Sequence, residues 1–245
     1  MNTKTLLLLG AKSDIGLAVA HRFAKEGFNI QLAARNSNSL KDECSNIMIR
    51  HNVKSTIHEL NILDYDSHEK FLNSLPELPT VVLSAIGLLD NRNESVGNIN
   101  KTVLIIRTNF EGIVILISKI AKKFVKRGSG TIIGISSVAG DRGKSSNYIY
   151  GSAKAGLSAF LSGLRNRVYK SNVDVITIKP GYVKTKMTSN MKLPKLLLTN
   201  PKTVANYIYS AYQRKKNIVY VTIVWQYIMR IIKLIPEEIF KRLKI

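Results

Sequence analysis

Short apolar runs alternate with longer amphipathic stretches along most of the chain. The runs cover residues 5–9, 29–33, 56–60, 81–85, 131–135, 173–178 and 218–221, and several are apolar almost throughout. Unbroken apolar runs of this length are typical of strands buried on both faces of a parallel sheet. Between them, segments such as 17–26 and 113–125 show the period of an amphipathic helix.

This alternation of strands and helices predicts an α/β protein with a doubly wound parallel sheet, the Rossmann fold. Ligands bind such sheets at the carboxyl ends of the strands. The chain shows no internal repeat and no Pro- or Ser-rich linker, so residues 1–245 are expected to form a single domain.

The apolar stretch at 223–235 has a different pattern. Its polar side chains, followed to position 237, are spaced by 4, 3 and 4 residues: Gln226, Arg230, Lys233 and Glu237. Trp225, Tyr227 and the basic residues in 241–244 are typical of a helix that lies in a membrane interface. A lid over a substrate pocket, or an oligomer contact, explains the pattern equally well. We therefore treat 223–245 as an amphipathic, basic C-terminal extension with these roles open.

The charge balance is strongly basic. The chain contains 37 Lys and Arg against 16 Asp and Glu, a formal net charge of +21, and residues 186–245 hold twelve basic and two acidic side chains. Such a balance favours anionic lipid or a phosphate-bearing substrate, and next an acidic carrier protein. No nucleic acid is expected, because no nucleic-acid-binding motif accompanies the charge.

Other features of the composition concern compartment and metals. The start MNTKTLLLLG has too short an apolar region for a signal peptide. The longest apolar stretch, 218–235, is interrupted by polar residues and is not expected to span a bilayer. We expect a cytoplasmic protein, peripheral on the inner face of the membrane if the C-terminal helix binds lipid. Cys44 is the single cysteine, and the four histidines lack metal-ligand spacing, so no metal site is expected.

A glycine-containing turn follows the first predicted strand. Residues 10–16 read Gly-Ala-Lys-Ser-Asp-Ile-Gly, and a predicted helix begins at once. Such a turn binds pyrophosphate, because free backbone N–H groups and the helix dipole converge there. Gly10 permits the tight turn, and Gly16 permits close helix–strand packing. Asp14 replaces the middle glycine of the usual pattern, so an ordinary turn with Asp14 as a helix cap is the alternative.

The second predicted strand leads to Arg35. In dinucleotide-binding folds an acid at this point binds the adenosine ribose, whereas an arginine accommodates a 2′-phosphate. Arg35 therefore favours NADP(H) over NAD(H), and Lys12 adds a second positive charge. The alternative is a solvated surface arginine.

The strand predicted at 131–135 leads into Ser136 and Ser137, and Tyr150 and Lys154 follow on a predicted helix. A spacing of four residues places Lys154 one turn from Tyr150 on the same face. An adjacent ammonium favours the phenolate, so we expect Lys154 to lower the pKa of Tyr150 towards neutrality. Tyr150 is then a general acid for carbonyl reduction, and Ser137 hydrogen-bonds the same substrate oxygen. Alone, a Tyr-x-x-x-Lys pair is equally a surface helix contact.

Together these motifs resemble the short-chain dehydrogenase/reductase family over essentially the whole chain. The resemblance implies the catalytic set Asn109, Ser137, Tyr150 and Lys154. Within that set, Asn109 holds a water that links Lys154 to bulk solvent, and Lys154 also holds the nicotinamide ribose. The helices after the Asn109 and Tyr150 regions form dimers in similar enzymes, which implies a homo-oligomer.

The same resemblance implies a set of cofactor-binding residues. They are Gly10, Lys12, Ser13, Asp14, Ile15, Gly16, Arg35, Asn61, Ile62, Ala85, Gly87, Tyr150, Lys154, Pro180, Gly181, Val183 and Thr185. The Val183 backbone would meet the nicotinamide amide, and Thr185 would lie near the phosphates. Besides Asp14, one departure stands out: residues 84–87 read Ser-Ala-Ile-Gly where the family usually has Asn-Asn-Ala-Gly. Both departures lie in the predicted dinucleotide-binding site, and the catalytic set is intact.

A narrower resemblance concerns the substrate. The segments LLLLGAKSDIGLA, AIGLLDN, ISSVAGDRGKSSNYIYGSAKAGL and IKPGYVKTKM, and the C-terminal stretch 227–243, are similar to the decaprenylphosphoryl-2-keto-ribose reductases of mycobacterial cell-wall synthesis. That resemblance implies reduction of a keto sugar carried on a polyprenyl phosphate, completing an epimerisation begun by a partner oxidase. Arg35 departs from their pattern, so the cofactor preference is not taken from them.

The sequence thus predicts an NAD(P)(H)-dependent oxidoreductase that reduces a ketone, on a keto sugar linked to a polyprenyl phosphate or nucleotide carrier in cell-envelope polysaccharide synthesis. The first alternative is a reductase of 3-oxoacyl groups or other small carbonyls, which would use the same catalytic residues. The second is a non-enzymatic NADP-binding redox sensor. The intact catalytic set argues against the sensor, because sensing has no chemical need for it.

Overall fold

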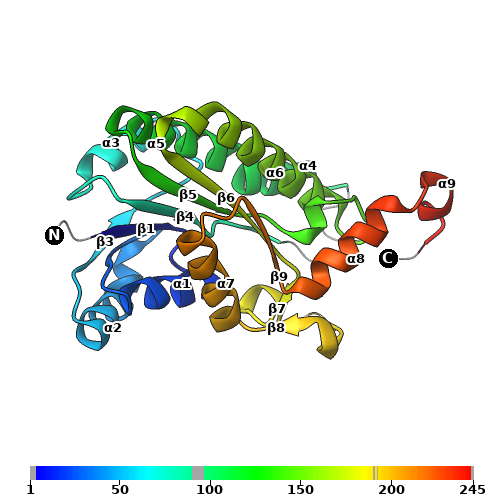
Figure 1. Ribbon diagram of the computed structural model, residues 1–245, viewed down its shortest axis with the longest axis horizontal. Helices are drawn as coiled ribbons and strands as arrows, with labels where there is room; N and C mark the ends of the chain where they lie inside the picture. Colours follow the sequence, from blue (N-terminus) through cyan, green and yellow to red (C-terminus); the bar gives the residue numbers. More distant parts are fainter. Residues whose placement is uncertain (1–3, 90–96, 190, 192, 244–245) are drawn as a thin grey trace.

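The computed structural model describes residues 4–89, 97–189, 191 and 193–243, and a seven-stranded sheet forms its centre (Figure 1). All neighbouring strands are parallel, in the order β3-β2-β1-β4-β5-β6-β9. The strands are β1 (Thr5–Leu9), β2 (Asn29–Ala34), β3 (Ser55–Glu59), β4 (Val81–Ser84), β5 (Gly130–Ile135), β6 (Val173–Pro180) and β9 (Ile218–Val221). The predicted doubly wound fold is confirmed.

The apolar character of the central strands follows from burial on both faces. All five residues of β1 and all four of β4 are buried. Leu6 and Leu8 point into one apolar core, and Leu7 and Leu9 point into the other. Since successive side chains of a strand face opposite sides of the sheet, a strand between two helical layers needs apolar residues at every position.

Two layers of helices cover the sheet (Figure 1). One layer contains α1 (Asp14–Ala24), α2 (Lys41–His51) and α7 (Pro201–Gln213). The other contains α3 (Ser67–Ser74), α4 (Ile99–Ile106), α5 (Gly112–Arg127) and α6 (Tyr148–Val168). The buried residues of α5 recur at helical spacing, from Ile113 through Leu116 and Ile120 to Phe124, which agrees with the predicted period.

The direction of winding reverses at β1. From β1 the chain continues to β2 and β3 on one side of the sheet, and β4, β5 and β6 lie on the other side. Such a reversal leaves a crevice at the carboxyl ends of the strands. The segments after β1, β4, β5 and β6 all emerge at this edge, and they contain the residues singled out in the sequence.

The last part of the chain extends from this edge. After β9 come α8 (Ile223–Leu234) and α9 (Glu237–Phe240), which project beyond the sheet (Figure 1). Two short strands, β7 (Tyr182–Val183) and β8 (Leu198–Thr199), pair below them. None of the helices in the described part of the chain is both long enough and apolar enough to cross a membrane. Lys244 and Ile245, the end of the predicted extension, lie outside the described residues.

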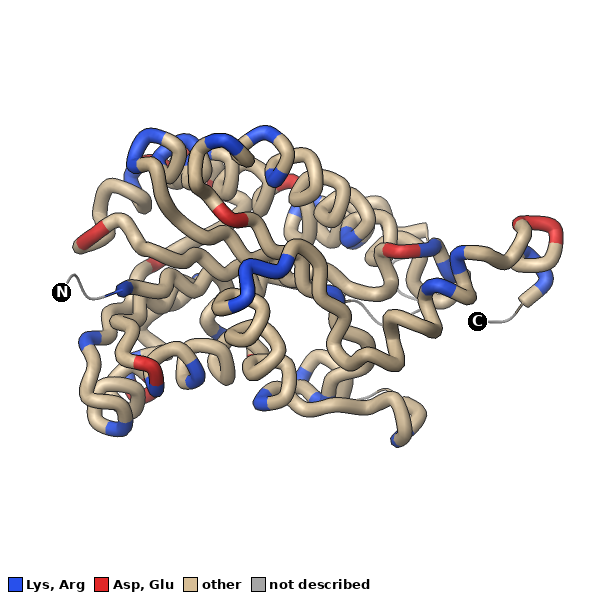
Figure 2. The backbone as a smooth tube through the Cα atoms, in the orientation of Figure 1, with Lys and Arg blue, Asp and Glu red and all other residues tan. Residues whose placement is uncertain are grey.

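The basic residues do not gather at one end of the molecule. Figure 2 shows Lys and Arg positions distributed over the outer helices of both layers. In the described part of the C-terminal quarter, Lys186 and Lys195 lie near β7 and β8, and the others lie in α7 with its following turn, which includes Lys215, or in the arm of residues 223–243, which contains α8 and α9. Within the described arm, four basic side chains accompany two acidic ones.

Candidate active site

The turn after β1 has the geometry that the sequence predicts. Gly10 adopts φ +84°, and a Cβ there would lie 2.9 Å from the backbone N of Ile86, so another residue would be strained and crowded. Gly16 is buried where α1 approaches β1, and a Cβ on it would lie 3.1 Å from a methyl carbon of Leu8. The turn thus brings the N-terminus of α1 against the sheet.

The alternative reading of Asp14 as a helix cap is wrong. Ser13 is the cap, because its side-chain oxygen accepts a hydrogen bond from the Gly16 N–H (3.2 Å). Asp14 Oδ2 instead accepts from the backbone N–H of Lys186 (2.7 Å), 172 residues later. The carboxylate therefore ties the start of α1 to the segment after β7, which sequence spacing could not show.

A groove of about 470 Å³ runs along the carboxyl edge over this turn. Most of the predicted cofactor-binding residues line it, namely Gly10, Lys12, Ser13, Asp14, Ile15, Arg35, Asn61, Ile62, Ala85, Gly87 and Thr185. Arg35 and Lys12 are exposed on its wall. Beside Arg35, the backbone N–H groups of Asn36 and Ser37 are bound by the Glu59 carboxylate at 2.8 and 2.7 Å, which holds the end of β2 in place.

A second cavity, of about 190 Å³, adjoins the groove and shares Ala85, Gly87 and Thr185 with it. Ser137, Tyr150 and Lys154 line this cavity together with Pro180, Gly181 and Val183. Two predicted residues, Gly16 and Asn109, line neither space. The structure therefore brings the residues from 131–154 and from 180–185 to one place beside the predicted nucleotide groove.

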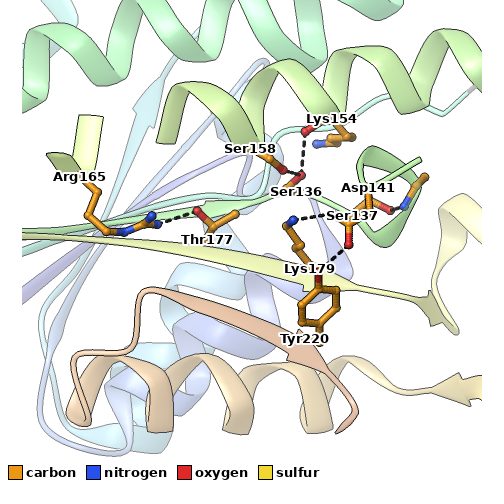
Figure 3. Close-up of polar contacts among 10 residues, drawn as sticks. Ser136, Ser137, Asp141, Lys154, Ser158, Arg165, Thr177, Lys179 and Tyr220 are labelled. Atoms are coloured by element: carbon orange, nitrogen blue, oxygen red, sulfur yellow. Dashed lines mark hydrogen bonds and ion pairs between the residues drawn. The ribbon is translucent and has the colours of Figure 1, made fainter. Parts of the chain in front are cut away.

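The end of β5 is anchored to α6 through Ser136. The buried Ser136 hydroxyl donates to the Lys154 carbonyl (2.9 Å) and hydrogen-bonds the Ser158 hydroxyl at 2.7 Å (Figure 3). Ser137 follows and caps the short helix η3 (Val138–Gly140), accepting from the Ala139 N–H at 3.1 Å. Ser136 thus fixes the distance between the strand that presents Ser137 and the helix that presents Tyr150.

A buried polar cluster holds the segment after η3. The Asp141 carboxylate, 2% exposed, forms an ion pair with Lys179 of β6 and accepts from the Tyr220 hydroxyl of β9 at 2.6 Å (Figure 3). Burial and the Asp141 carboxylate raise the pKa of Tyr220, so its hydroxyl stays protonated as the donor. The loop after Ser137 is thereby tied to two strands.

Tyr150 and Lys154 occupy the first two turns of α6. The Lys154 ammonium is buried, lies 5.7 Å from the centre of the Tyr150 ring, and donates to the carbonyls of Ile135 (3.2 Å) and Ile86 (3.4 Å). The Ser137 side chain lines the same cavity as Tyr150 and acts to lower the pKa of its phenol. Their predicted placement on one face of one helix agrees with the structure.

The expected effect of Lys154 on the Tyr150 pKa is wrong. Burial raises the pKa of Tyr150 to about 12, and the Ser137 side chain opposes this rise only in part. Burial also lowers the pKa of Lys154 to about 8. Loss of water disfavours both charged forms, and it is the largest cause of both shifts. At neutral pH the Tyr150 hydroxyl is therefore protonated, and it can donate this proton to the oxygen of a ketone that is being reduced.

Asn109 lies behind the cavity, fully buried in a π-helical turn, η2 (Arg107–Glu111). Its amide N–H groups donate to Leu88 O (2.7 Å) and Ile105 O (2.9 Å), and its Oδ1 accepts from Leu88 N (3.1 Å). Asn109 and Lys154 therefore hold the same segment, 86–88, from two sides. The water relay implied by the resemblance stays a prediction.

Three predicted cofactor-binding residues of the segment after β6 line the reaction cavity, and Thr185 also lines the groove. Gly181 faces the indole of Trp225, and a Cβ on Gly181 would lie only 1.9 Å from it. Val183 is buried, and its carbonyl accepts from Thr188 at 2.6 Å. Thr185 forms a capping box with Thr188. Gly181 is thus needed for the approach of α8.

Several residues of the cavity were missed from the sequence. Trp225 was counted among the signs of a membrane interface, but it is 3% exposed, lines the cavity with Val138 and packs against Met229, as the alternative of a pocket lid requires. Lys144 and Asn147 also line the cavity. Their position between Ser137 and Tyr150 was the available signal, since that segment must pass the reacting groups.

The residues of the groove fit a nicotinamide dinucleotide. The turn at Gly10 offers a close backbone approach, the N-terminus of α1 faces the groove, and Lys12 and Arg35 supply positive charge for phosphates. Lys154 stands where the groove meets the cavity. Among the described residues, no group of three or more His, Cys, Asp or Glu could hold a metal ion.

A doubly wound sheet with a glycine turn at β1, and Ser, Tyr and Lys gathered beside it, defines a nucleotide-dependent oxidoreductase. The profile of the short chain dehydrogenase family matches residues 4–195, and the chain belongs to this family. It is therefore an oxidoreductase of the short-chain type.

Relatives agree with this assignment. The chain is 30% identical over 242 residues to an uncharacterized oxidoreductase of Mycobacterium tuberculosis, covering 97% of this chain and 96% of that one. It is 28% identical over 224 residues to a ketoacyl reductase of Nostoc, covering 86% and 76%. A short-chain dehydrogenase from Sphingobium yanoikuyae, solved in complex with NADPH, superposes with a TM-score of 0.82 at 20% identity, covering 96% and 97%.

Proposed function

We propose that the protein is an NADP(H)-dependent reductase of a ketone on a sugar linked to a polyprenyl phosphate or another phosphorylated carrier, in cell-envelope polysaccharide synthesis. The observation that supports reduction is the position of Ser137 and protonated Tyr150 together in one cavity next to the dinucleotide groove. The similarity of segments such as ISSVAGDRGKSSNYIYGSAKAGL to keto-ribose reductases supports the sugar. A partner oxidase would supply the ketone.

Each catalytic side chain has one task in this proposal. Tyr150 donates its proton to the ketone oxygen, and Ser137 positions that oxygen by a hydrogen bond. Lys154, charged below about pH 8, stabilises the developing negative charge near Tyr150 and resupplies the proton. A bound nicotinamide dinucleotide would supply the hydride for the carbonyl carbon.

The preference for NADP(H) over NAD(H) depends on Arg35. Arg35 and Lys12 line the groove with exposed, positively charged ends. A 2′-phosphate beside Arg35 would form charge-assisted hydrogen bonds, which are stronger than neutral ones.

A 3-oxoacyl reductase is the second candidate. The observation that favours it is the ketoacyl reductase of Nostoc, which covers most of this chain. The same Ser137, Tyr150 and Lys154 would reduce a 3-oxoacyl thioester. The two candidates therefore differ in the substrate and not in the chemistry.

One experiment separates them. Purified protein is incubated with NADPH and either a membrane lipid extract or a soluble 3-oxoacyl thioester, and the reduced product is identified by mass spectrometry. We expect reduction of a lipid-linked keto sugar by the unmodified protein and none by Tyr150→Phe. Reduction of the thioester alone would replace the proposal by the second candidate.

A further inference from the structure

Two polar groups of the reaction cavity, the Lys144 ammonium and the Asn147 Oδ1 atom, have no partner among the residues that the structure describes. Lys144 and Asn147 both line the cavity that contains Ser137 and Tyr150. The Lys144 ammonium forms neither an ion pair nor a hydrogen bond with any residue that the structure describes. The Asn147 Oδ1 atom is buried and lacks a hydrogen-bond donor. These two groups lie on the segment that connects η3 to α6, on the substrate side of the cavity.

Both groups are unfavourable without a ligand. Partial burial lowers the pKa of Lys144, because its ammonium loses water and gains no counter-charge. A buried carbonyl oxygen without a donor is also unfavourable, because it loses its hydrogen bonds to water and gains none in the protein. A ligand that brings an anion to Lys144 and a hydroxyl to Asn147 would relieve both costs.

The remaining residues that line the cavity restrict where the polar atoms of a ligand can bind. Apolar side chains cover much of the cavity, including Leu89, Val138, Met187, Met191 and Trp225. The described residues that line it include no Asp or Glu, whereas Lys144 and Lys154 are both present. An anion is therefore attracted to the cavity, and Lys144 is the cation that the catalytic set leaves unused.

We propose that Lys144 and Asn147 form a substrate subsite that binds a phosphate-type anion and a neighbouring hydroxyl of the ketone. This inference rests on the proposed function and specifies its substrate class: a hydroxylated ketone that carries an anionic group. Lys144 binds the anion, and Asn147 Oδ1 accepts a hydrogen bond from the hydroxyl group. The ketone oxygen meets Ser137 and Tyr150.

The probes are ribulose and ribulose 5-phosphate, which share a ketone and hydroxyls and differ in a phosphate. Binding to the NADP⁺-loaded protein is measured by calorimetry, so the readout does not depend on turnover. We expect the phosphate to bind at least about tenfold more tightly, the effect of one charge-assisted contact. Lys144→Met removes this preference. Lys170→Met, a matched change at an exposed lysine outside the cavity, leaves it unchanged.

Asn147 is tested separately with Asn147→Ala. We expect this variant to bind both sugars more weakly while it keeps the preference for the phosphate, and to bind cyclohexanone, which has no hydroxyl, like the unmodified protein. Farnesyl phosphate and inorganic phosphate then compete with ribulose 5-phosphate. Stronger competition by farnesyl phosphate identifies a lipid carrier as the source of the anion, and equal competition identifies a free sugar phosphate.

Three outcomes overturn the subsite: no binding of either sugar, equal binding of both, or unchanged phosphate preference in Lys144→Met. Failure of the proposed function is distinguishable. If ribulose 5-phosphate binds through Lys144 and no ketone is reduced with NADPH, the subsite stands and the reductase proposal fails. If ketones are reduced without charge preference, the reverse holds.

Discussion

At the scale of single residues, burial decides the chemistry of the site. It raises the pKa of Tyr150 to about 12 and lowers that of Lys154 to about 8, so the phenol keeps its proton while the ammonium loses its own just above neutrality. The pair is thereby prepared for proton donation to a ketone. The reverse reaction must first remove a proton from a phenol of high pKa.

The role of Tyr150 is tested by Tyr150→Phe. The ring is retained and the donor is lost, so turnover should fall at least about 100-fold. NADPH binding, followed by fluorescence titration, should change little, because the ring still fills its place. A variant that keeps normal turnover would remove Tyr150 from the mechanism.

The pH dependence of reduction follows from Lys154. Below about pH 8 its ammonium is charged and supports proton donation, and above that value the charge is lost, while Tyr150 stays protonated to about pH 12. We expect kcat/KM for reduction to be level near pH 6–7 and to fall with a one-proton slope above about pH 8. NADPH affinity over the same range is the control. A rate that rises through pH 8 would contradict the assignment.

The cofactor preference is tested by Arg35→Asp. Attraction of a 2′-phosphate becomes repulsion, so NADPH affinity should fall by about ten- to a hundredfold relative to NADH. Arg50→Asp makes the same charge change at an exposed position of α2 outside the groove, and should leave the ratio unchanged. Equal affinities for NADPH and NADH in the unmodified protein would disprove the role of Arg35.

At the scale of elements, α8 presents three different faces. Trp225, Met229 and Ile232 are buried against the cavity wall. Gln226, Arg230 and Lys233 form the predicted polar stripe. Five apolar side chains are exposed on the remaining face: Ile223, Val224, Tyr227, Ile231 and Leu234. The buried face can cover the pocket while the exposed apolar face contacts a membrane, so the two predicted roles of this helix are compatible.

Arg142 attaches α8 to the loop that follows Ser137. It donates to the carbonyls of Ile232 and Ile235, both at 2.6 Å, and stacks 3.7 Å from the centre of the Phe240 ring. Arg142→Met should lose at least about 1.5 kcal/mol of local stability, since charge-assisted bonds contribute this much. Hydrogen exchange within 223–240 should accelerate about tenfold.

Arg230→Met is the matched control, because Arg230 lies on the polar stripe of the same helix and its guanidinium is 5.8 Å from the Tyr227 ring centre. Exchange in 223–240 should stay near that of the unmodified protein. Equal protection in both variants would show that α8 is held by its apolar contacts alone.

At the scale of the whole molecule, we propose that the exposed face of α8 contacts an anionic membrane. Its five apolar side chains adjoin Arg230 and Lys233, an arrangement typical of interfacial helices. Sedimentation with anionic liposomes should bring down the protein. Ile231→Glu with Leu234→Glu should weaken binding at least about tenfold, because two apolar side chains lose their burial in lipid.

Ile49→Glu is the control, since Ile49 is 85% exposed on α2, in the helical layer that lies apart from the arm (Figure 1). The described arm has four basic and two acidic side chains, so added salt should weaken binding only moderately. If the protein stays in the supernatant at low salt, the membrane proposal is wrong and α8 serves only as a wall of the pocket.

The predicted homo-oligomer is a separate proposal. Residues of α5 and α6 line a groove of about 690 Å³ that could be covered by a second copy of the chain.

The strands of the sheet, the turn at Gly10 and the pairing of Tyr150 with Lys154 could be predicted from the amino-acid sequence. Each of these depends on neighbours within one strand, turn or helix, so local spacing is sufficient. The predicted strand ends differ from the observed ones by at most two residues, as in β6, which continues to Pro180. Local spacing also placed Arg35 at the end of β2.

The surroundings of these residues depend on the packing of the whole chain and could not be predicted from local sequence. The pKa of Tyr150 depends on how much water the folded chain removes, and the sequence-based expectation had the wrong sign. Trp225 lines the cavity because Gly181, 44 positions earlier in the chain, has no side chain and leaves room for the indole. The Asp14 carboxylate accepts a hydrogen bond from the backbone N–H of Lys186 and does not cap its own helix. Burial and contacts between distant segments arise from the packing of whole elements, which local spacing does not encode.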